Sequence, residues 1–600
     1  TLLSFKDYAD GSHPGALVAT ENLPKDWPAN PTPEQSVLHG EYEELAGHDA
    51  EARQLYTAAL KMEPGYLRAH MALGRMEMRA GRVPQALEQY QAAVERDPWS
   101  GEARYGLGVA LAAQGQHRLA RAEFAHISPN SSRFALRDMA MGSADFALGD
   151  FSRAEIELRK AVEANPRDLA AHALLAGVLR RQVNFDAAGE ALSRLEAIDP
   201  TSAVAAAERF LIAQARQAPA NQESALLDAL CASHPQQYLE LAAFYARVSA
   251  WPEIVEILRA HVAAQDQHSK TLDPMVLYWL AFAETRTDGP VRARQTLGRI
   301  RAANRTPEIF PFRFEELRVL EEITSQNLQD DLAWQLLGAL RASLGRRQEA
   351  VAAWKRAVDI KPNDRVTQRL LGFANHEWLG QPADARAHLN RAVELEPKDA
   401  EAIVALAESQ AAAGSISEAI GTLKAALARL PASDALRAML ARLLVVHEEP
   451  DAALSVLQSK EFFIAESNAE LVDLYRETKL SQGLLLLRKG QTTTGSAVLL
   501  EAGKLPATIA ASDFERVLVP KLAYYQGLAH WLRGEGETAR LLWQKTAQMV
   551  GLEGEDAYFQ GRALDRLGQR EQAKAIFDSL AAKSTREGES LRAQAHTHYL

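Results

Sequence analysis

Two histidine–glutamate pairs come closest, among the residues of this sequence, to a metal-binding motif. His376-Glu377 and His447-Glu448 match the first two positions of His-Glu-x-x-His, in which a second histidine four residues on faces the same ion. Neither pair has that second histidine, so exposed helix residues explain both pairs better. His596 and His598 would lie about 200° apart on a helix and could not easily share a metal. The sequence therefore predicts neither a metal site nor a cofactor.

Nucleophile and nucleotide motifs are also missing. The single cysteine, Cys231, excludes an internal disulfide and an all-cysteine metal site, and its neighbours suit a small apolar helix residue. Gly106-Leu-Gly108 lacks the third glycine of a dinucleotide-binding turn, and no Gly-x-x-x-x-Gly-Lys-Ser/Thr phosphate loop occurs. We therefore predict that this segment is not an enzyme.

The charge balance gives no reason to expect binding to nucleic acid or a membrane. The net charge is −11, with 78 acidic against 67 basic residues in 600, whereas affinity for phosphate backbones rests on clustered Lys and Arg. No run of about 18 apolar residues is present, so we expect no transmembrane helix.

One helical face combines guanidinium groups with methionines. Steps of three, four, three and one residue place these side chains together, and a tyrosine follows at the equivalent position of the next helix. Such a face could bind an acidic or carboxylate-ended peptide by bidentate hydrogen bonds and apolar contact. The alternative is an ordinary solvated face whose arginines pair with nearby glutamates. The candidate groove consists of Arg68, Met71, Arg75, Met78, Arg79 and Tyr105.

A second candidate surface is aromatic. Tyr524, Trp531 and Tyr558 share a helical register with the basic residues Lys521 and Arg562 beside them. Aromatic planes could stack on a sugar or on the side chains of a partner. The alternative is that they complete the packing between helices, which is the more frequent role of such residues.

A strict 34-residue period organises the elements that must position these side chains. Glycines recur at 40, 74, 108 and 142, alanines at 52, 86, 120, 154 and 188, and prolines at 64, 98, 166 and 200. Within one unit, small residues at Gly74 and Ala86 let two helices approach closely, Tyr90 fills the space beside them, and Pro98 ends the second helix. One helix pair cannot bury its apolar face alone, so neighbouring pairs must stack.

This pattern resembles the tetratricopeptide repeat (TPR). It is clearest at Trp334, Leu337, Gly338, Ala350, Trp354, Ala357 and Pro362. The resemblance implies an all-α, right-handed superhelical solenoid of antiparallel helix pairs. It also implies that the first helix of each pair lines the concave side, which would place both candidate surfaces there. The peptide-clamping members of this family use lysine and asparagine at the groove positions, and this sequence departs from that choice.

The periodicity divides the chain into five segments. We predict an extended, Pro-rich linker at 1–33, a regular array at 34–200, degenerate helical repeats at 201–330, a second regular array at 331–458 and further TPR-like repeats at 459–600. We expect the irregular middle section to contain helix pairs of uneven length and to bend or divide the superhelix. Because the chain begins at Thr1 and ends within a helical pattern, we expect a piece of a longer protein.

The order of features carries a second, more specific resemblance. The regular units are followed by 238–242 (YLELA), 274–281 (PMVLYWLA) and 309–316 (IFPFRFEE), and then by the units with Trp334 and Trp354. This layout resembles the C-terminal TPR half of large bacterial proteins whose N-terminal β-sandwich is similar to galactose mutarotases. The resemblance implies a carbohydrate-related domain upstream, and it carries over no catalytic residue.

Two hypotheses of function follow. The chain is a non-catalytic interaction scaffold that holds a protein or peptide partner, or its own upstream β-sandwich domain. Alternatively, it is the accessory helical half of a carbohydrate-active or carbohydrate-binding bacterial protein, with carbohydrate bound through the upstream domain. A cytoplasmic location is favoured, although a signal peptide cannot be assessed in this segment.

Overall fold

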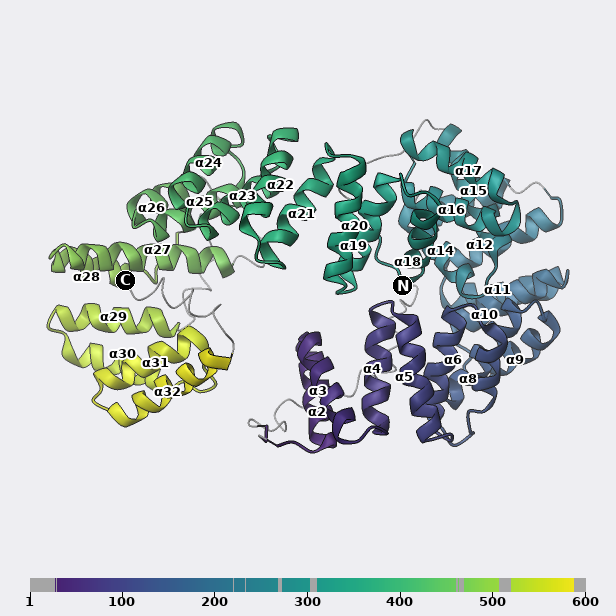
Figure 1. The fold of residues 1–600 in the computed structure, drawn as a ribbon, viewed down its shortest axis with the longest axis horizontal. Helices are drawn as coiled ribbons and strands as arrows, with labels where there is room; N and C mark the ends of the chain where they lie inside the picture. Colours follow the sequence, from purple (N-terminus) through teal and green to yellow (C-terminus); the bar gives the residue numbers. More distant parts are fainter. Residues whose placement is uncertain are drawn as a thin grey trace. The chain divides into compact units, whose positions relative to one another are not determined.

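The fold is built from helices alone in the part of the chain that the structure describes. The computed structural model describes residues 27–586, apart from 29, 219–220, 232–233, 268–271, 303–309, 460–461, 463–468 and 507–518. Within these residues there are thirty-one α-helices, one short 3-10 helix and no strand. Figure 1 shows successive helices running back and forth as antiparallel pairs, so the predicted all-α solenoid is confirmed. The predicted linker falls almost entirely outside the described residues.

Contacts divide the chain into two compact units, Thr1–Ile360 and Lys361–Leu600. The helices of unit 1 are α2 Pro33–Leu45, α3 Asp49–Met62, α4 Leu67–Arg79, α5 Val83–Arg96, α6 Gly101–Ala113, α7 His117–Ala125, α8 Phe134–Ala147, α9 Phe151–Ala164, α10 Leu169–Arg181, α11 Phe185–Ile198, α12 Ala203–Ala215, α13 Asn221–Leu230, α14 Pro235–Arg247, α15 Trp251–Gln267, α16 Pro274–Thr287, α17 Pro290–Gly298, η2 Arg299–Ala302, α18 Phe314–Gln326, α19 Asp331–Ser343 and α20 Arg347–Ile360.

Unit 2 continues the same alternation. Its helices are α21 Arg365–Glu377, α22 Pro382–Leu395, α23 Ala400–Ala412, α24 Ile416–Arg429, α25 Asp434–Val446, α26 Pro450–Gln458, α27 Ala469–Arg488, α28 Thr492–Glu501, α29 Pro520–Leu532, α30 Gly536–Ala547, α31 Gly554–Arg566 and α32 Arg570–Arg586. None of the described helices combines the length and the apolar character that a bilayer crossing requires.

Close approach within each pair depends on glycine, as the sequence pattern predicts. A Cβ atom added at Gly74 would lie 2.7 Å from Cε1 of Tyr90, which is buried against α4. Gly527 has the same relation to Trp543, whose Nε1 would lie 2.5 Å from the added Cβ. Trp543 donates from Nε1 to the carbonyl of Tyr524, 3.1 Å away, which fixes the ring over the glycine. The glycine in the first helix and the aromatic residue in the second therefore form one packing unit.

The irregular middle section contains an extra helix. Seven helices, α12 to α18, fall between residues 201 and 330, so the pairing α12/α13, α14/α15 and α16/α17 leaves α18 without an antiparallel partner. α18 packs instead against α14, α16 and α19. Arg313, immediately before α18, donates to Glu240 Oε1 and to the carbonyl of Gln236 on α14, at 2.8 and 3.1 Å. The extra helix is thus tied to α14 by a buried guanidinium group.

A buried charged network joins the regular repeats to this middle section. Arg180 on α10 donates to Glu208 on α12 at 2.7 Å and to Glu253 on α15 at 2.9 Å, and the three side chains are 8%, 1% and 2% exposed. Tyr245 on α14 donates its hydroxyl to Glu208 at 2.9 Å. Burial alone would raise the pKa of Glu253, but the charges of Arg180 and Arg181 outweigh it and lower that pKa. The network therefore favours the charged form of Glu253 and joins four helices by buried polar contacts.

Replacing Gly527 by alanine will destabilise α29 and α30 by about 1–3 kcal/mol, because the added methyl group overlaps the Trp543 ring. The matched control is Gly421→Ala in α24, where an added Cβ meets nothing within 4 Å. That change should stabilise its helix by about 0.5–1 kcal/mol. Hydrogen exchange of peptides covering each helix pair measures both effects, and equal responses at the two glycines would contradict the packing unit.

Replacing Arg180 by alanine will cost about 3–5 kcal/mol in the opening free energy of α10, α12 and α15, since Glu208 loses its only cationic partner among the described residues. The control is Arg159→Ala, which removes an exposed pair with Glu155 on α9 and should cost at most about 1 kcal/mol. Hydrogen exchange at near-neutral pH measures the difference. A cost for Arg180→Ala as small as that of the control would show that the network does not hold these helices together.

Candidate functional site: the unit 1 cavity

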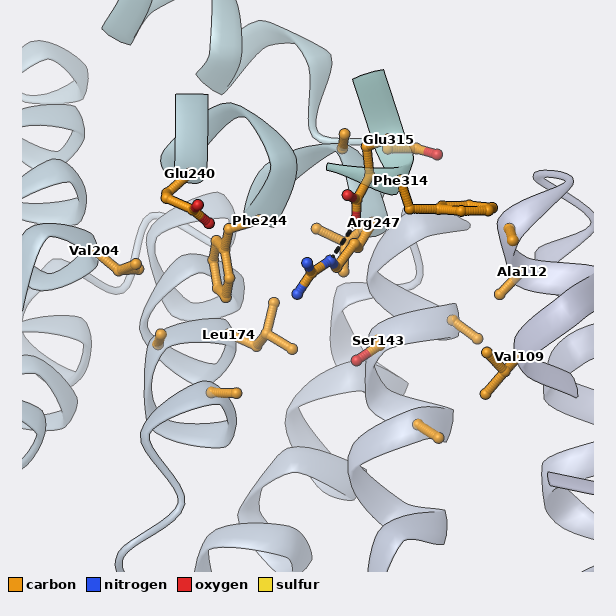
Figure 2. Close-up of a pocket in the computed structure, with 18 of the residues that line it drawn as sticks. Val109, Ala112, Ser143, Leu174, Val204, Glu240, Phe244, Arg247, Phe314 and Glu315 are labelled. Carbon is orange, nitrogen blue, oxygen red and sulfur yellow. Dashed lines mark hydrogen bonds and ion pairs between the residues drawn. The ribbon is translucent and has the colours of Figure 1, made fainter. Parts of the chain in front are cut away.

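A large cavity lies inside unit 1, on the side formed by the first helices of successive pairs. Its volume is about 980 Å³. Figure 2 shows side chains from several helices converging on it, with Arg247 and Glu315 above and Leu174 and Ser143 below. Residues that line it include Tyr105, Val109, Ala112, Met139, Ser143, Leu174, Val204, Glu240, Phe244, Arg247, Phe314, Glu315, Leu317 and Arg318. We call this space the unit 1 cavity.

The lining residues follow helical spacing on each contributing element. On α6 they recur at 105, 109 and 112, on α14 at 240, 244 and 247, and on α18 at 314, 318 and 321. Steps of three and four residues put each set on one face of its helix. The first helices of the pairs thus supply most of the wall, and the extra helix α18 supplies the remainder.

The extra helix closes one edge of the unit 1 cavity against repeats far away in sequence. A Cβ added at Gly81, in the turn after α4, would lie 2.6 Å from Cδ2 of Leu317. Phe314 packs on the apolar cluster that includes Met71, Tyr105 and Leu111. Because residues 81 and 317 meet, the turn after α4 and the inserted helix α18 close this edge of the cavity.

Two guanidinium groups line the cavity, and they differ in whether a carboxylate is bonded to them. Arg247 donates from Nε to Glu315 Oε1 at 2.6 Å, and Figure 2 shows its guanidinium pointing into the space. Arg318 has neither a hydrogen bond nor an ion pair with any residue that the structure describes. Burial and the nearby charge of Arg286 lower the pKa of Arg318, although not enough to remove its proton at neutral pH. Arg318 is therefore an exposed cation that no carboxylate among the described residues binds directly, in a wall that also carries Glu240, Glu315 and Glu321.

A buried histidine adjoins this cation. His117 begins α7, and its Nε2 lies 3.0 Å from the hydroxyl oxygen of Ser249, which follows α14. Burial, followed by the charge of Arg318, lowers the pKa of His117. His117 is thus held neutral at the point where two distant parts of unit 1 touch.

The predicted groove residues lie mostly outside the unit 1 cavity. Arg68 pairs with Glu41 at 3.0 Å, and Arg79 pairs with Glu44 at 2.8 Å, with Arg75 at 3.9 Å from the same carboxylate. The side chains of Met71 and Met78 are 8% and 2% exposed, so they pack in the core. Tyr105 lines the cavity and contacts Phe124 with ring centroids 5.7 Å apart. Peptide binding by this set stays a prediction.

The structure brings some residues of the predicted aromatic surface into contact. Arg562 donates to the hydroxyl oxygens of Tyr558 and Tyr524 at 2.8 and 3.2 Å, while Tyr524 itself is buried. Lys521 is buried between Glu477 and Glu555, at 2.6 and 2.8 Å. Trp531 is half exposed, at 52%. Sugar or partner binding at these residues likewise stays a prediction.

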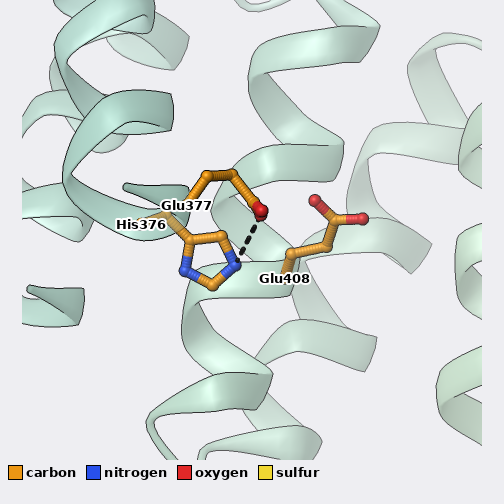
Figure 3. A group of neighbouring side chains, drawn as sticks. All are labelled: His376, Glu377 and Glu408. Atoms are coloured by element: carbon orange, nitrogen blue, oxygen red, sulfur yellow. Dashed lines mark ion pairs between the residues drawn. The ribbon is translucent and has the colours of Figure 1, made fainter. Parts of the chain in front are cut away.

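Among the residues that the structure describes, one side-chain group could hold a metal ion. The sequence motif covers only His376 and Glu377, and the structure adds Glu408 from α23, as Figure 3 shows. His447, in contrast, pairs with Glu449 and the hydroxyl of Ser417 and belongs to no such group in the described part of the chain. Cys231 is buried, and burial raises the pKa of its thiol to about 12. His596 and His598 lie outside the described residues.

The comparisons with known proteins agree with the helical pairs. Tetratricopeptide repeat family models match residues 46–98, 77–131 and 139–203, residues 332–364 and residues 379–431. These segments are tetratricopeptide repeats. The matched TPR segments include α6, α8 and α10, which form one side of the unit 1 cavity.

Two curated relatives share parts of the sequence. The chain is 41% identical over 87 residues to tetratricopeptide repeat protein 7A from Homo sapiens, covering 14% of this chain and 10% of that protein. It is 23% identical over 459 residues to cellulose synthase operon protein C from Pseudomonas fluorescens (strain SBW25), covering 64% of this chain. The chain spans 35% of the length of the latter protein.

Solved structures with helical repeats are also similar. Naa15/Naa10 bound to HypK-THB matches with a TM-score of 0.25 at 14% identity, covering 92% of this chain and 89% of that one. The APC/C hetero-tetramer Cut9-Hcn1 matches with a TM-score of 0.30 at 13% identity, over 89% of this chain and 96% of that one. The type IV pilus biogenesis factor PilW matches with a TM-score of 0.31 at 20% identity, over 34% and 94%.

Replacing His117 by glutamine will reduce the loss of stability of unit 1 in acid. Because the folded-state pKa of His117 is lowered, the neutral form is favoured, and stability falls as the pH drops below the unfolded value of about 6.5. Glutamine can still bond Ser249 but does not titrate. Hydrogen exchange of peptides covering α7 and α14, between about pH 5 and pH 8, measures the change. His126→Gln, at an exposed position, is the control. Identical pH profiles for His117→Gln and the parent chain would contradict the prediction.

Proposed function

We propose that this chain is a non-catalytic interaction scaffold whose unit 1 cavity holds an apolar, acidic segment of a partner protein. Tetratricopeptide repeats support a role in protein interaction, and the cavity is the observation that carries the finer proposal. A cavity of about 980 Å³ whose wall combines apolar side chains with acidic and basic groups has the character of a binding site. The enclosing first helices need no rearrangement to present it.

The apolar side chains of the cavity wall favour a partner segment that is itself mainly apolar. Val109, Leu174 and Phe244 come from three different helices and face the same space, as Figure 2 shows. Burial of apolar side chains among them would supply most of the binding free energy, at about 25 cal/mol per Å² of apolar surface removed from water. Glycine- and alanine-rich stretches of the first helices leave space for the apolar side chains of the partner segment.

The two guanidinium groups of the cavity wall favour a partner segment that carries negative charge. Arg318 is exposed and has no hydrogen bond or ion pair with a carboxylate among the described residues, so its guanidinium can accept an anionic partner. Arg247 already has Glu315, so its remaining N–H groups contribute hydrogen bonds and less net charge. An aspartate or glutamate side chain within an apolar segment satisfies both requirements.

A second candidate function is supported by a specific likeness. We infer an accessory role beside a carbohydrate-related domain, because 64% of this chain is similar to cellulose synthase operon protein C and because the layout resembles proteins with a mutarotase-like β-sandwich. Glycan-binding or glycan-cleaving activity of the longer protein, measured with and without residues 34–600, tests it. Unchanged activity and specificity without these residues would contradict the accessory role.

Charge reversal at Arg318 tests the interaction proposal directly. Peptides selected from a random display library on the parent chain should be apolar with an acidic residue, and Arg318→Glu should weaken their binding about tenfold to a hundredfold. That range corresponds to one charge-assisted hydrogen bond of about 1.5–3 kcal/mol. Isothermal titration calorimetry with the selected peptides measures the dissociation constants.

The matched control is Arg356→Glu, an exposed arginine on α20 that does not line the unit 1 cavity. It changes the net charge by the same amount and should leave peptide affinity unchanged. Selected peptides that bind the Arg318→Glu variant as tightly as the parent chain would show that the cavity is not the site. Equal weakening by both variants would indicate a general charge effect and would also contradict the proposal.

A further inference from the structure

Three potential metal ligands meet on the first helices of two successive pairs in unit 2. His376 and Glu377 are the last residues of α21, and Glu408 lies on α23. One ligand atom from each residue lies within 4.8 Å of the other two, and Figure 3 shows the imidazole and both carboxylates turned toward the same space. The residues on each helix alone could not form this group, because the third ligand comes from the following repeat.

The charge on Glu408 lacks direct compensation. Among the residues that the structure describes, neither a hydrogen bond nor an ion pair reaches its carboxylate, although it is partly buried. Burial raises the pKa of Glu408, the charge of Glu377 raises it further, and His376 and Arg442 act against this only through space. Comparable carboxylates elsewhere have a bonded cation, such as Glu349 with Arg346 at 2.5 Å. A cation placed among the three side chains would neutralise two carboxylates at once.

We propose that His376, Glu377 and Glu408 bind a divalent transition-metal ion, with zinc as the best match to their donor atoms. One imidazole nitrogen and two carboxylate oxygens suit zinc, whereas magnesium and calcium prefer oxygen donors alone. Zinc bonds of about 2.0–2.2 Å place tetrahedral ligands about 3.4 Å apart. Nε2 of His376 and Oε1 of Glu377 already lie 3.4 Å apart, and a rotation of the partly buried Glu408 side chain can bring its oxygen from at most 4.8 Å to that spacing.

Three protein ligands leave the fourth position of a tetrahedral ion free for water or for a donor atom of another molecule. The group lies in unit 2 and shares no residue with the unit 1 cavity. The outcome for this metal site is therefore independent of the outcome for the proposed function. The ion would tie α21 to α23 and add a Lewis-acidic point to the first helices of this unit.

The experiment measures zinc binding to the full chain. His596 and His598 are first replaced by alanine, so that the two histidines near the chain end cannot bind zinc themselves. Isothermal titration calorimetry with zinc chloride, after removal of metals with a chelator, should give one equivalent of bound zinc. His376→Ala and Glu408→Gln should each weaken binding at least about tenfold, since even residues that only support a ligand cost that much.

The matched control is His447→Ala, which removes a histidine paired with Glu449 at 3.0 Å but not part of a three-ligand group in the described residues. Its zinc affinity should equal that of the parent. Cobalt(II) provides a second readout, because the visible absorption of a tetrahedral cobalt site should disappear in Glu408→Gln even where circular dichroism shows an intact fold. Binding that is undetectable in the parent, or unchanged in both His376→Ala and Glu408→Gln, would overturn the proposal.

Discussion

The contact between a glycine in the first helix of a pair and a large side chain in the second is the constraint on which the repeats depend. Gly74 with Tyr90, and Gly527 with Trp543, bring two helix axes close enough for one ring to fill the gap. Once that distance is set, the apolar face left on each pair can be buried only by the next pair. The stacking, and with it the row of first helices that forms the cavity wall, follows from this local contact.

A solenoid made only of such pairs would leave its inner surface open, and unit 1 departs from that arrangement in one helix. α18 has no antiparallel partner and occupies a place among α14, α16 and α19. It buries an apolar face that includes Leu317, Val319 and Leu320, and Arg313 adds a polar link to α14. A separate buried network of Arg180, Glu208 and Glu253 joins α10, α12 and α15. Buried ion pairs contribute little net stability but are costly to break, so they favour one arrangement of these helices over its alternatives.

Sequence periodicity predicts the parts of this structure that depend on neighbours about sixteen residues apart. The helix pairs and the glycine–aromatic contacts follow from the 34-residue phase, because each contact repeats, and the role of the first helices follows from the resemblance to tetratricopeptide repeats. The cavity does not follow, because Leu317 approaches Gly81 across more than two hundred residues and nothing in either segment encodes that distance. The candidate groove shows the same limit. Arg68 and Arg79 find Glu41 and Glu44 on the preceding pair, an outcome that a face considered alone does not reveal.

The chemical groups of interest were missed for a related reason. A metal motif search looks for ligands on one helix, whereas Glu408 reaches His376 from the next repeat. Arg318 lies in the degenerate section, where the loss of the repeat code conceals which residues face inward. The useful signal is therefore an ionisable residue on a first or inserted helix that forms no hydrogen bond or ion pair with an opposite charge among the described residues. Arg318 meets that criterion in the cavity wall of unit 1, and Glu408 meets it in unit 2.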